Sequence, residues 1–271
     1  MIHIDVKLEA VIEDQPQEMD LDIVFEDEDV IVINKPEGLL VHPGAGNPNN
    51  TLLNGLLALN DTQANLPRAG IVHRLDKLTS GLMVVAKTSL AYNSLVNQLK
   101  DHTVTRKYWA LVKGQVNSEF TIDQPIGRHK TQRVKMAVVL NGKHAVTHIQ
   151  PLEAFKHYSL IEAELETGRT HQIRVHLHYL GHQLLGDPVY GNSMRVEPGL
   201  DEELKENLRA FPRQALHAKV LSFTHPRINE KVMFESELPD DFFEILEELR
   251  DFDPAHDEQR EGDWDVIYQE D

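Results

Sequence analysis

The sequence Arg68-Ala-Gly-Ile-Val-His-Arg-Leu-Asp-Lys-Leu-Thr-Ser-Gly81 runs directly into the apolar segment Gly81-Leu-Met-Val-Val-Ala86. The apolar segment has the length and β-branched content of a buried strand. The polar stretch before it holds a single carboxylate, Asp76, between Arg74 and Lys77. Nearby positive charge keeps a carboxylate ionised. Asp76 is therefore either one half of a structural ion pair or a group ready to act as a nucleophile or base.

The composition excludes several classes of protein. The chain has 271 residues and no cysteine, which excludes a disulfide framework and a thiolate metal site. It holds no apolar run close to the ~20 residues of a membrane span, so we expect no membrane partner. The N-terminus, Met1–Lys7, lacks the basic and apolar regions of a secretory signal. These features predict a cytoplasmic protein with one large domain.

Charge is distributed unevenly along the chain, whose formal net charge is −17. Residues 1–67 carry 2 Lys or Arg against 13 Asp or Glu, residues 68–196 carry 17 against 9, and residues 197–271 carry 8 against 22. A basic middle between two acidic flanks is typical of a surface that faces phosphate groups. A surface that is merely uneven in charge gives the same counts, so both interpretations stay open at this point.

Apolar patterning predicts a mixture of strands and helices. We expect strands at 30–34, 81–86, 105–113 and 158–166, helices at 90–100, 170–180 and 241–250, and a cationic loop at 128–135. The elements do not alternate as regular βαβ units, which favours an α/β (α+β) domain on a mixed sheet over a doubly wound fold. We assign residues 1–22 to a linker or N-terminal arm, residues 23–250 to the domain and residues 251–271 to an acidic C-terminal tail.

Two patterns suggest ligand sites but fit them poorly. Gly44-Ala-Gly46 lacks the third glycine of a dinucleotide fingerprint and the Gly-Lys-Ser/Thr of a phosphate loop. His171 and His178 would lie roughly 10 Å apart on the expected helix, too far to share one zinc ion, so we predict no metal. The same helix puts His171, Arg174 and His178 on one polar face, which either lines a cleft or faces solvent.

Several segments, taken together and in their order along the chain, resemble the RluA-type pseudouridine synthases. They are Ile23–Asp29 with Asn34–Pro36, His73–Gly81, Arg106–Tyr108, Glu166–His176 and Arg213–His217, with further agreement at His42–Pro48 and Gly186–Gly191. The resemblance implies the fold of that family, a mixed and largely antiparallel sheet with helices flanking a basic catalytic cleft. It also implies an isomerase that uses no metal and no cofactor.

The resemblance assigns a role to individual residues of this chain. Asp76 matches the catalytic aspartate, Tyr108 the tyrosine that stacks on the target base, and Arg174 the basic residue that pairs with the aspartate. Arg74 matches the arginine that fills the gap left by the extruded uridine. The aspartate either attacks C1′ of the sugar or removes the 2′ proton, and both routes stay open. Further substrate-binding residues are expected at His73, Arg128, Lys130, Arg133, Arg169 and His171.

The resemblance also implies the partner of this chain. The expected substrate is structured RNA, and the nearest resemblance implies a stem-loop of large-subunit ribosomal RNA, free or in pre-ribosomal particles. We expect the protein to bind it as a monomer. Many relatives carry an S4-type RNA-binding domain before the catalytic domain, and the 22 residues before Ile23 are too few to form one. We therefore expect either a catalytic fragment or a short member of the family.

Two other function classes stay open on the sequence. The first is a non-catalytic RNA-binding or ribosome-assembly factor that keeps the fold. The trio Asp76, Tyr108 and Arg174 argues against it, because binding alone does not require all three groups. The second is a metal-dependent hydrolase, which unchanged activity in excess chelator would exclude.

Overall fold

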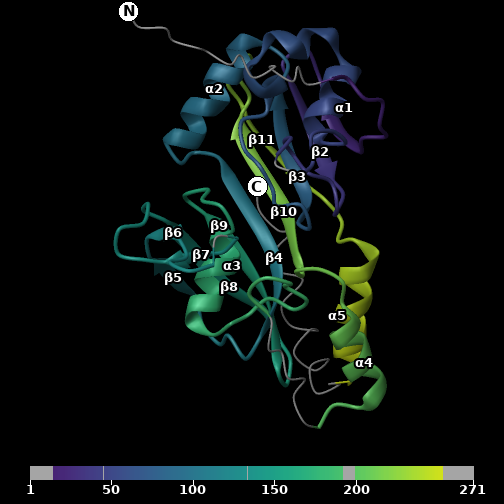
Figure 1. Cartoon of the computed structure of the whole chain (residues 1–271), viewed down its shortest axis with the longest axis vertical. Coiled ribbons are helices and arrows are strands. Elements are labelled where there is room, and N and C mark those ends of the chain that lie inside the picture. The colour runs from purple at the N-terminus through teal and green to yellow at the C-terminus, as the bar shows by residue number, and fades with distance from the viewer. Residues whose placement is uncertain (1–14, 45, 133, 192–198, 253–271) are drawn as a thin grey trace, which may run out of the picture.

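The computed structural model describes residues 15–44, 46–132, 134–191 and 199–252 (Figure 1). Most of the expected arm and tail, residues 1–14 and 253–271, lies outside these ranges. The described end of the arm packs against α1 (Leu52–Leu59). Asn54 of this helix donates from Nδ2 to Gln15 O at 2.8 Å, and the N–H of Gln17 donates to Asn54 O at 3.0 Å. Two hydrogen bonds therefore fix this part of the arm on the domain.

One nine-stranded sheet organises the chain. Its strands are β1 (Ile23–Glu26), β2 (Val30–Lys35), β3 (Ser80–Ala86), β4 (Thr105–Lys113), β5 (Phe120–Asp123), β8 (Val146–Ala154), β9 (Tyr158–Leu165), β10 (Leu216–Thr224) and β11 (Lys231–Glu235). They lie in the order β1-β2-β3-β10-β4-β9-β8-β5, and β11 pairs with β10. Each pairing in the described sheet is antiparallel except that of β3 with β10. The expected mixed, largely antiparallel sheet is confirmed.

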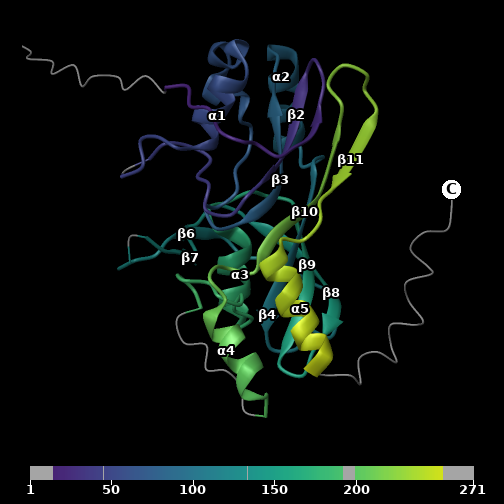
Figure 2. The same ribbon diagram turned by 90° about the vertical axis from the view of Figure 1, so that its right-hand side faces the viewer.

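Helices cover both faces of this sheet. They are α1, α2 (Ser89–Lys100), α3 (Gln172–Leu180), α4 (Glu202–Ala210) and α5 (Asp240–Phe252), with the short 3₁₀ helices η1 (Asp61–Asn65) and η2 (Pro67–Gly70). α1 and α3 pack in one core cluster on the same side of the sheet, as Figure 2 shows. α2, α4 and α5 pack in the clusters of the opposite face. A separate hairpin pairs β6 (Ile126–Arg128) with β7 (Met136–Val138). None of the described helices is long and apolar enough to cross a membrane.

The central position of β3 explains why its sequence is apolar throughout. Met83 belongs to the core cluster that contains α1, and its neighbour Leu82 to the cluster that contains α2. A strand covered on both faces is expected to be a continuous apolar run. Gly81 has φ +111°, and a Cβ at this position would lie 2.4 Å from Ala218 O of β10. Only glycine therefore permits the close pairing of β3 with β10.

Most of the expected elements are present, with small differences at their ends. Thr88 Oγ1 accepts the N–H of Ala91 and caps the start of α2. The expected helix start at Thr170 is wrong, because α3 begins at Gln172. His171 before it has φ 56°, a left-handed conformation that cannot continue a helix. α1 has no counterpart among the expected elements, because its almost uniformly apolar sequence carries no helical period.

Candidate active site

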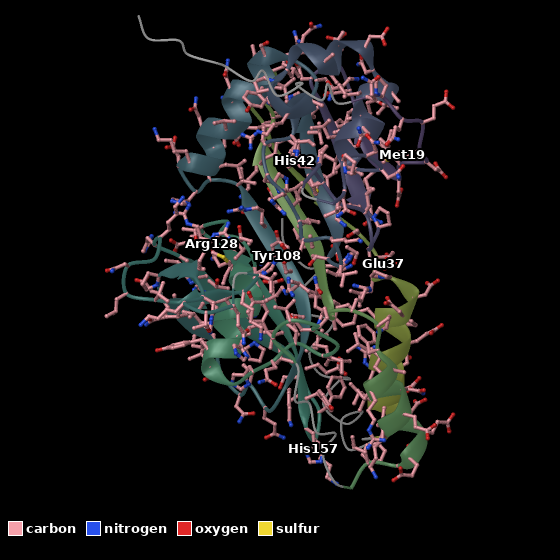
Figure 3. The ribbon with its side chains drawn as sticks, viewed as in Figure 1. Met19, Glu37, His42, Tyr108, Arg128 and His157 are labelled. Carbon is pink, nitrogen blue, oxygen red and sulfur yellow. The ribbon has the colours of Figure 1, made fainter. Side chains whose placement is uncertain are left out.

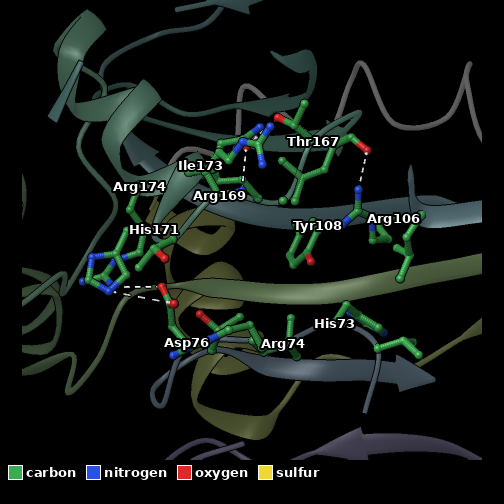
Figure 4. A pocket seen from close by; sticks show the side chains of 18 of the residues that line it. His73, Arg74, Asp76, Arg106, Tyr108, Thr167, Arg169, His171, Ile173 and Arg174 are labelled. Atoms are coloured by element: carbon green, nitrogen blue, oxygen red, sulfur yellow. Dashed lines mark hydrogen bonds and ion pairs between the residues drawn. The ribbon is translucent and has the colours of Figure 1, made fainter. Parts of the chain in front are cut away.

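A pocket of about 560 Å³ opens on the face of the sheet that α1 and α3 cover (Figure 4). Its cationic lining residues are Arg68, Arg74, Lys100, Arg106, Arg169 and Arg174, and its histidines are His42, His73, His102 and His171. Asp76 is the one carboxylate among the described residues that line it. The volume falls within the roughly 300–1,000 Å³ of small-molecule sites. The pocket therefore accepts a group the size of a nucleotide in a cationic setting, beside a single acid.

Hydrogen bonds from neighbouring segments hold the backbone around Asp76 in place. Lys35 is fully buried at the end of β2 and donates from Nζ to Lys77 O at 3.2 Å. Burial lowers the pKa of Lys35 to about 7. The side chain of Leu75 is buried in the core, and the N–H of Thr79 donates to Asp76 O at 3.1 Å. The turn therefore presents its carboxylate to the pocket from a fixed backbone.

Arg174 joins Asp76 to a second, buried carboxylate. Its Nη1 donates to Asp76 Oδ2 at 2.9 Å, while its Nε and Nη2 donate to the two oxygens of Asp187 at 2.8 and 2.9 Å. The side chains of Arg174, Asp187 and Asp76 are 5%, 1% and 17% exposed. Burial alone would lower the pKa of Arg174 and raise that of Asp187. Their mutual hydrogen bonds outweigh burial, so the pKa of Arg174 is raised, that of Asp187 is lowered, and both are ionised at neutral pH.

His171 lies beside the other oxygen of Asp76. Its Nε2 is 3.9 Å from Asp76 Oδ1, and its Nδ1 is 3.0 Å from the hydroxyl of Tyr190. Tyr190 accepts the N–H of Met136 at 2.9 Å, and its ring centroid lies 5.1 Å from Arg174 Cζ. Burial lowers the pKa of His171 and raises that of Tyr190. Asp76 therefore has a cation on one oxygen and a neutral imidazole near the other (Figure 4).

Tyr108 and Arg106 project from one face of β4 into the other side of the pocket (Figure 4). Both side chains are buried, and burial raises the pKa of Tyr108 and lowers that of Arg106. Arg106 donates from Nη2 to the carbonyls of Leu165 and Glu166 at 3.3 and 3.2 Å. Tyr108 therefore keeps its phenolic proton and offers an aromatic face in the same pocket as Asp76.

Three further residues that the sequence singled out also line the pocket. Arg74 is exposed at the pocket, and its guanidinium makes no hydrogen bond or ion pair with another described residue. Arg169 is exposed as well and donates from Nε to His144 O at 2.9 Å. His73 accepts the N–H of Val84 at Nε2, at 3.1 Å, and burial lowers its pKa to about 3. His73 is therefore a neutral anchor for β3, whereas the two arginines present their charge to solvent.

The remaining sequence candidates lie away from the pocket lining. Arg128 ends β6, and Lys130 follows in the turn of the β6–β7 hairpin, which packs against α3 (Figure 3). Arg133 lies outside the described residues. His171, Arg174 and His178 share one face of α3, as expected, since each contacts the ring of Tyr190. His171 and Arg174 line the pocket, whereas His178 is exposed and does not.

Sequence reasoning missed Asp187 and Tyr190, which contact Arg174 and His171, and also the pocket cations Arg68, Lys100 and Arg106. Asp187 and Tyr190 belong to Gly186-Asp-Pro-Val-Tyr-Gly191, a segment that agrees with the family but whose composition indicates only a turn. Nothing in the spacing of Asp187 connects it to Arg174. Within the described ranges, no group of three His, Asp or Glu side chains is placed to hold a metal ion. The arrangement supplies a single acid paired with a cation, a buried aromatic face and further cations for an anionic substrate.

Comparison with known proteins gives this geometry a family context. Residues 29–179 match the family described as RNA pseudouridylate synthase. Ribosomal large subunit pseudouridine synthase D of Pseudomonas aeruginosa is 54% identical over 86% of this chain and 73% of its own length. The proteins of that name from Vibrio parahaemolyticus and Escherichia coli K12 are 50% and 48% identical, over 91% and 95% of this chain and 77% and 79% of their own lengths.

Solved structures show the same relationship in three dimensions. Human RNA pseudouridylate synthase domain containing 4 superposes with a TM-score of 0.65 at 29% identity, over 84% of this chain and 93% of that chain. Human RNA pseudouridylate synthase domain containing 1 gives a TM-score of 0.62 at 29% identity, over 81% and 84%. The matched family region includes Asp76, Tyr108 and Arg174, so these three pocket residues lie in the part of the chain that the family match covers.

Proposed function

The chain belongs to the RNA pseudouridylate synthase family, and from this we propose that it isomerises uridines of large-subunit ribosomal RNA. It is an isomerase that converts uridine to pseudouridine in RNA. In this reaction the bond from N1 of the base to C1′ breaks, the base turns, and a bond forms from C5 to C1′. The proton on C5 is lost and N1 gains one, so no redox partner is needed.

The observation that carries our assignment of the site is the isolation of Asp76. It is the one acid among the described lining residues, and its Oδ2 is held by Arg174 at 2.9 Å. The guanidinium of Arg174 pairs with Oδ2, and both attack on C1′ and removal of the 2′ proton require a carboxylate. Oδ1 has His171 Nε2 at 3.9 Å and no hydrogen bond at ordinary length from the described residues. We therefore assign Oδ1 as the reacting oxygen.

Tyr108 and Arg74 fit the other two tasks of the reaction. The target base is stacked in the RNA, so the enzyme extrudes it and closes the gap. Arg74 is exposed at the pocket and has a planar guanidinium that stacks and contacts phosphate. Tyr108 is buried in the pocket with its proton retained, so its ring can hold the detached base by stacking. A base held there is protected from water, which suppresses hydrolysis.

We further propose that the chain acts as a monomer on a stem-loop of RNA in the cytoplasm. The pocket is complete within one chain, which supports a monomer bound to a stem-loop. The exposed basic residues Arg128 and Lys130 on the hairpin beside α3, with Arg169, give the RNA backbone further cationic contacts. A ribosomal RNA substrate supports a cytoplasmic location and action on free RNA or pre-ribosomal particles.

Mapping of pseudouridines in large-subunit ribosomal RNA tests the function and the site together. RNA from cells lacking the gene should miss specific pseudouridines that the wild-type gene restores. Asp76→Asn should restore none while keeping RNA affinity and the melting temperature, because the amide is isosteric but cannot attack or accept the proton. Asp61→Asn, an exposed aspartate outside the pocket, is the matched control and should restore all of them. An identical pseudouridine map with and without the gene would refute the function, and restoration by Asp76→Asn would refute the site.

A further inference from the structure

The segment Gly186–Gly191 contacts both partners of Asp76. Asp187 binds Arg174 through two hydrogen bonds, and its Oδ1 also accepts the N–H of Tyr190 at 3.0 Å. Tyr190 in turn contacts His171 through its hydroxyl at 3.0 Å. The contacts form a closed ring that runs through Asp76, Arg174, Asp187, Tyr190, His171 and back to Asp76. Two residues of this short segment therefore support the two groups beside the Asp76 carboxylate: Asp187 contacts Arg174, and Tyr190 contacts His171.

This segment is itself rigidly held. The N–H of Gly191 donates to Asp187 O at 3.0 Å, which closes the turn. Gly186 has φ +66°, and a Cβ there would lie 2.1 Å from Arg213 O, so the backbone passes directly against its neighbour. Just before the segment, the N–H of Leu185 donates to Leu111 O of β4 at 2.9 Å. A side chain on this segment therefore has little freedom to move relative to the sheet.

Tyr190 and Asp76 lie at opposite nitrogens of His171. The oxygen of Tyr190 accepts the backbone N–H of Met136 at 2.9 Å and lies 3.0 Å from Nδ1 of His171. A hydroxyl can donate to Nδ1 or accept from it, but the carboxylate oxygen Oδ1 of Asp76, 3.9 Å from Nε2, favours a proton on Nε2 and so leaves Nδ1 to accept from Tyr190. A neutral imidazole that accepts at Nδ1 carries its proton on Nε2. Nε2 is the atom that faces Asp76 Oδ1.

The tautomer of His171 decides whether Oδ1 of Asp76 faces an N–H group or a nitrogen lone pair. With the proton on Nε2, His171 presents the positive end of an N–H dipole to Oδ1 at 3.9 Å. With the proton on Nδ1, the lone pair of Nε2 would face the same anionic oxygen and repel it. We propose that Tyr190 is a positioning residue that fixes His171 as the Nε2–H tautomer, and that His171 orients Oδ1 of Asp76 for reaction. This inference rests on the proposed role of Asp76 and gives His171 and Tyr190 positioning roles around it.

Nitrogen-15 NMR of histidine-labelled protein tests the tautomer without any RNA. His171→Gln assigns the signal of His171 by difference. The wild-type protein at neutral pH should show His171 with its proton on Nε2, and Tyr190→Phe should show a mixture of both tautomers. A wild-type signal from the Nδ1–H tautomer would overturn the inference, whatever the activity of the enzyme. This measurement uses the wild-type protein, so it does not depend on whether Tyr190→Phe folds.

Kinetics on an unmodified transcript of large-subunit ribosomal RNA test the consequence. Tyr190→Phe keeps the ring over Arg174 and should lower kcat about tenfold with KM unchanged, because only orientation in the bound state is lost. In a His171→Gln background the same change should have no further effect. Tyr179→Phe, an exposed tyrosine of α3, is the control and should match the wild type.

The two proposals fail in different ways. An equal loss in both backgrounds, or a rise in KM alone, would show that Tyr190 does not act through His171. Wild-type enzyme that modifies no uridine of this RNA would refute the proposed substrate, whereas the tautomer measurement would still decide what Tyr190 does to His171.

Discussion

Replacing Arg174 with alanine should destabilise this protein far more than the loss of an exposed arginine does. The change removes both hydrogen bonds to Asp187, whose side chain is 1% exposed and keeps only the backbone N–H groups of Val189 and Tyr190. Removal of one partner from a buried ion pair costs about 3–5 kcal/mol, because the other charge stays buried without compensation. Asp76 is 17% exposed and can be hydrated, so its lost bond adds little.

Circular dichroism can follow the expected loss in two experiments. Urea unfolding gives the change in the free energy of unfolding, and thermal unfolding gives the melting temperature. At about 2–4 °C per kcal/mol for a chain of this size, the melting temperature should fall by about 6–20 °C. Arg174→Ala with Asp187→Asn should recover part of this loss, because the amide carries no charge into the interior. Arg169→Ala is the control: this arginine is exposed just before the same helix, and its loss should cost less than about 0.5 kcal/mol.

The pH dependence gives a second check with a definite sign. In the wild type the pKa of Asp187 is lowered, so its stabilisation is present above the unfolded value of 3.8 and is lost as pH falls. Without Arg174 the buried carboxyl group has a raised pKa and takes a proton more readily. The gap in unfolding free energy between wild type and Arg174→Ala should therefore narrow towards acid pH. A variant within about 1 kcal/mol of the wild type at pH 7, with no such narrowing, would refute the buried-pair argument.

Two further predictions concern acid stability and RNA affinity. Burial lowers the pKa of His73 and His217 from 6.5 to about 3, so the unfolded chain binds more protons and stability should fall as pH drops through this window. His217→Gln should flatten that slope by up to about 1.4 kcal/mol per pH unit in unfolding titrations; an unchanged slope would show that His217 is charged in the fold. Arg74→Gln should leave the melting temperature unchanged and reduce the slope of log affinity for single-stranded RNA against log salt by about 0.7 in a binding titration. An unchanged slope would remove Arg74 from the phosphate contacts.

The sequence predicts those parts of the structure that depend on local pattern. β3 is recognisable as a short, continuous apolar run, and β4 by its alternation, because these patterns report directly on the faces that the strands bury. The start of α3 cannot be recognised from the sequence, because the left-handed φ of His171 comes from its surroundings and not from a residue type that favours it. The role of Asp187 is hidden for a similar reason. Its partner Arg174 lies thirteen residues earlier on a helix, and the pair is made by the path of the chain between them.

The net charge of −17 does not prevent an RNA-facing surface, because opposite charges are sorted by position. Every Lys and Arg that lines the pocket comes from residues 68–196, the segment that is basic in sequence. Two acids of that same segment point elsewhere: Glu162 and Glu164 alternate on β9 with residues of the pocket face and line a separate groove. Charges separated by more than the Debye length, about 8 Å at physiological salt, scarcely affect one another at the surface. A phosphate that enters the pocket therefore interacts mainly with the cations that line it.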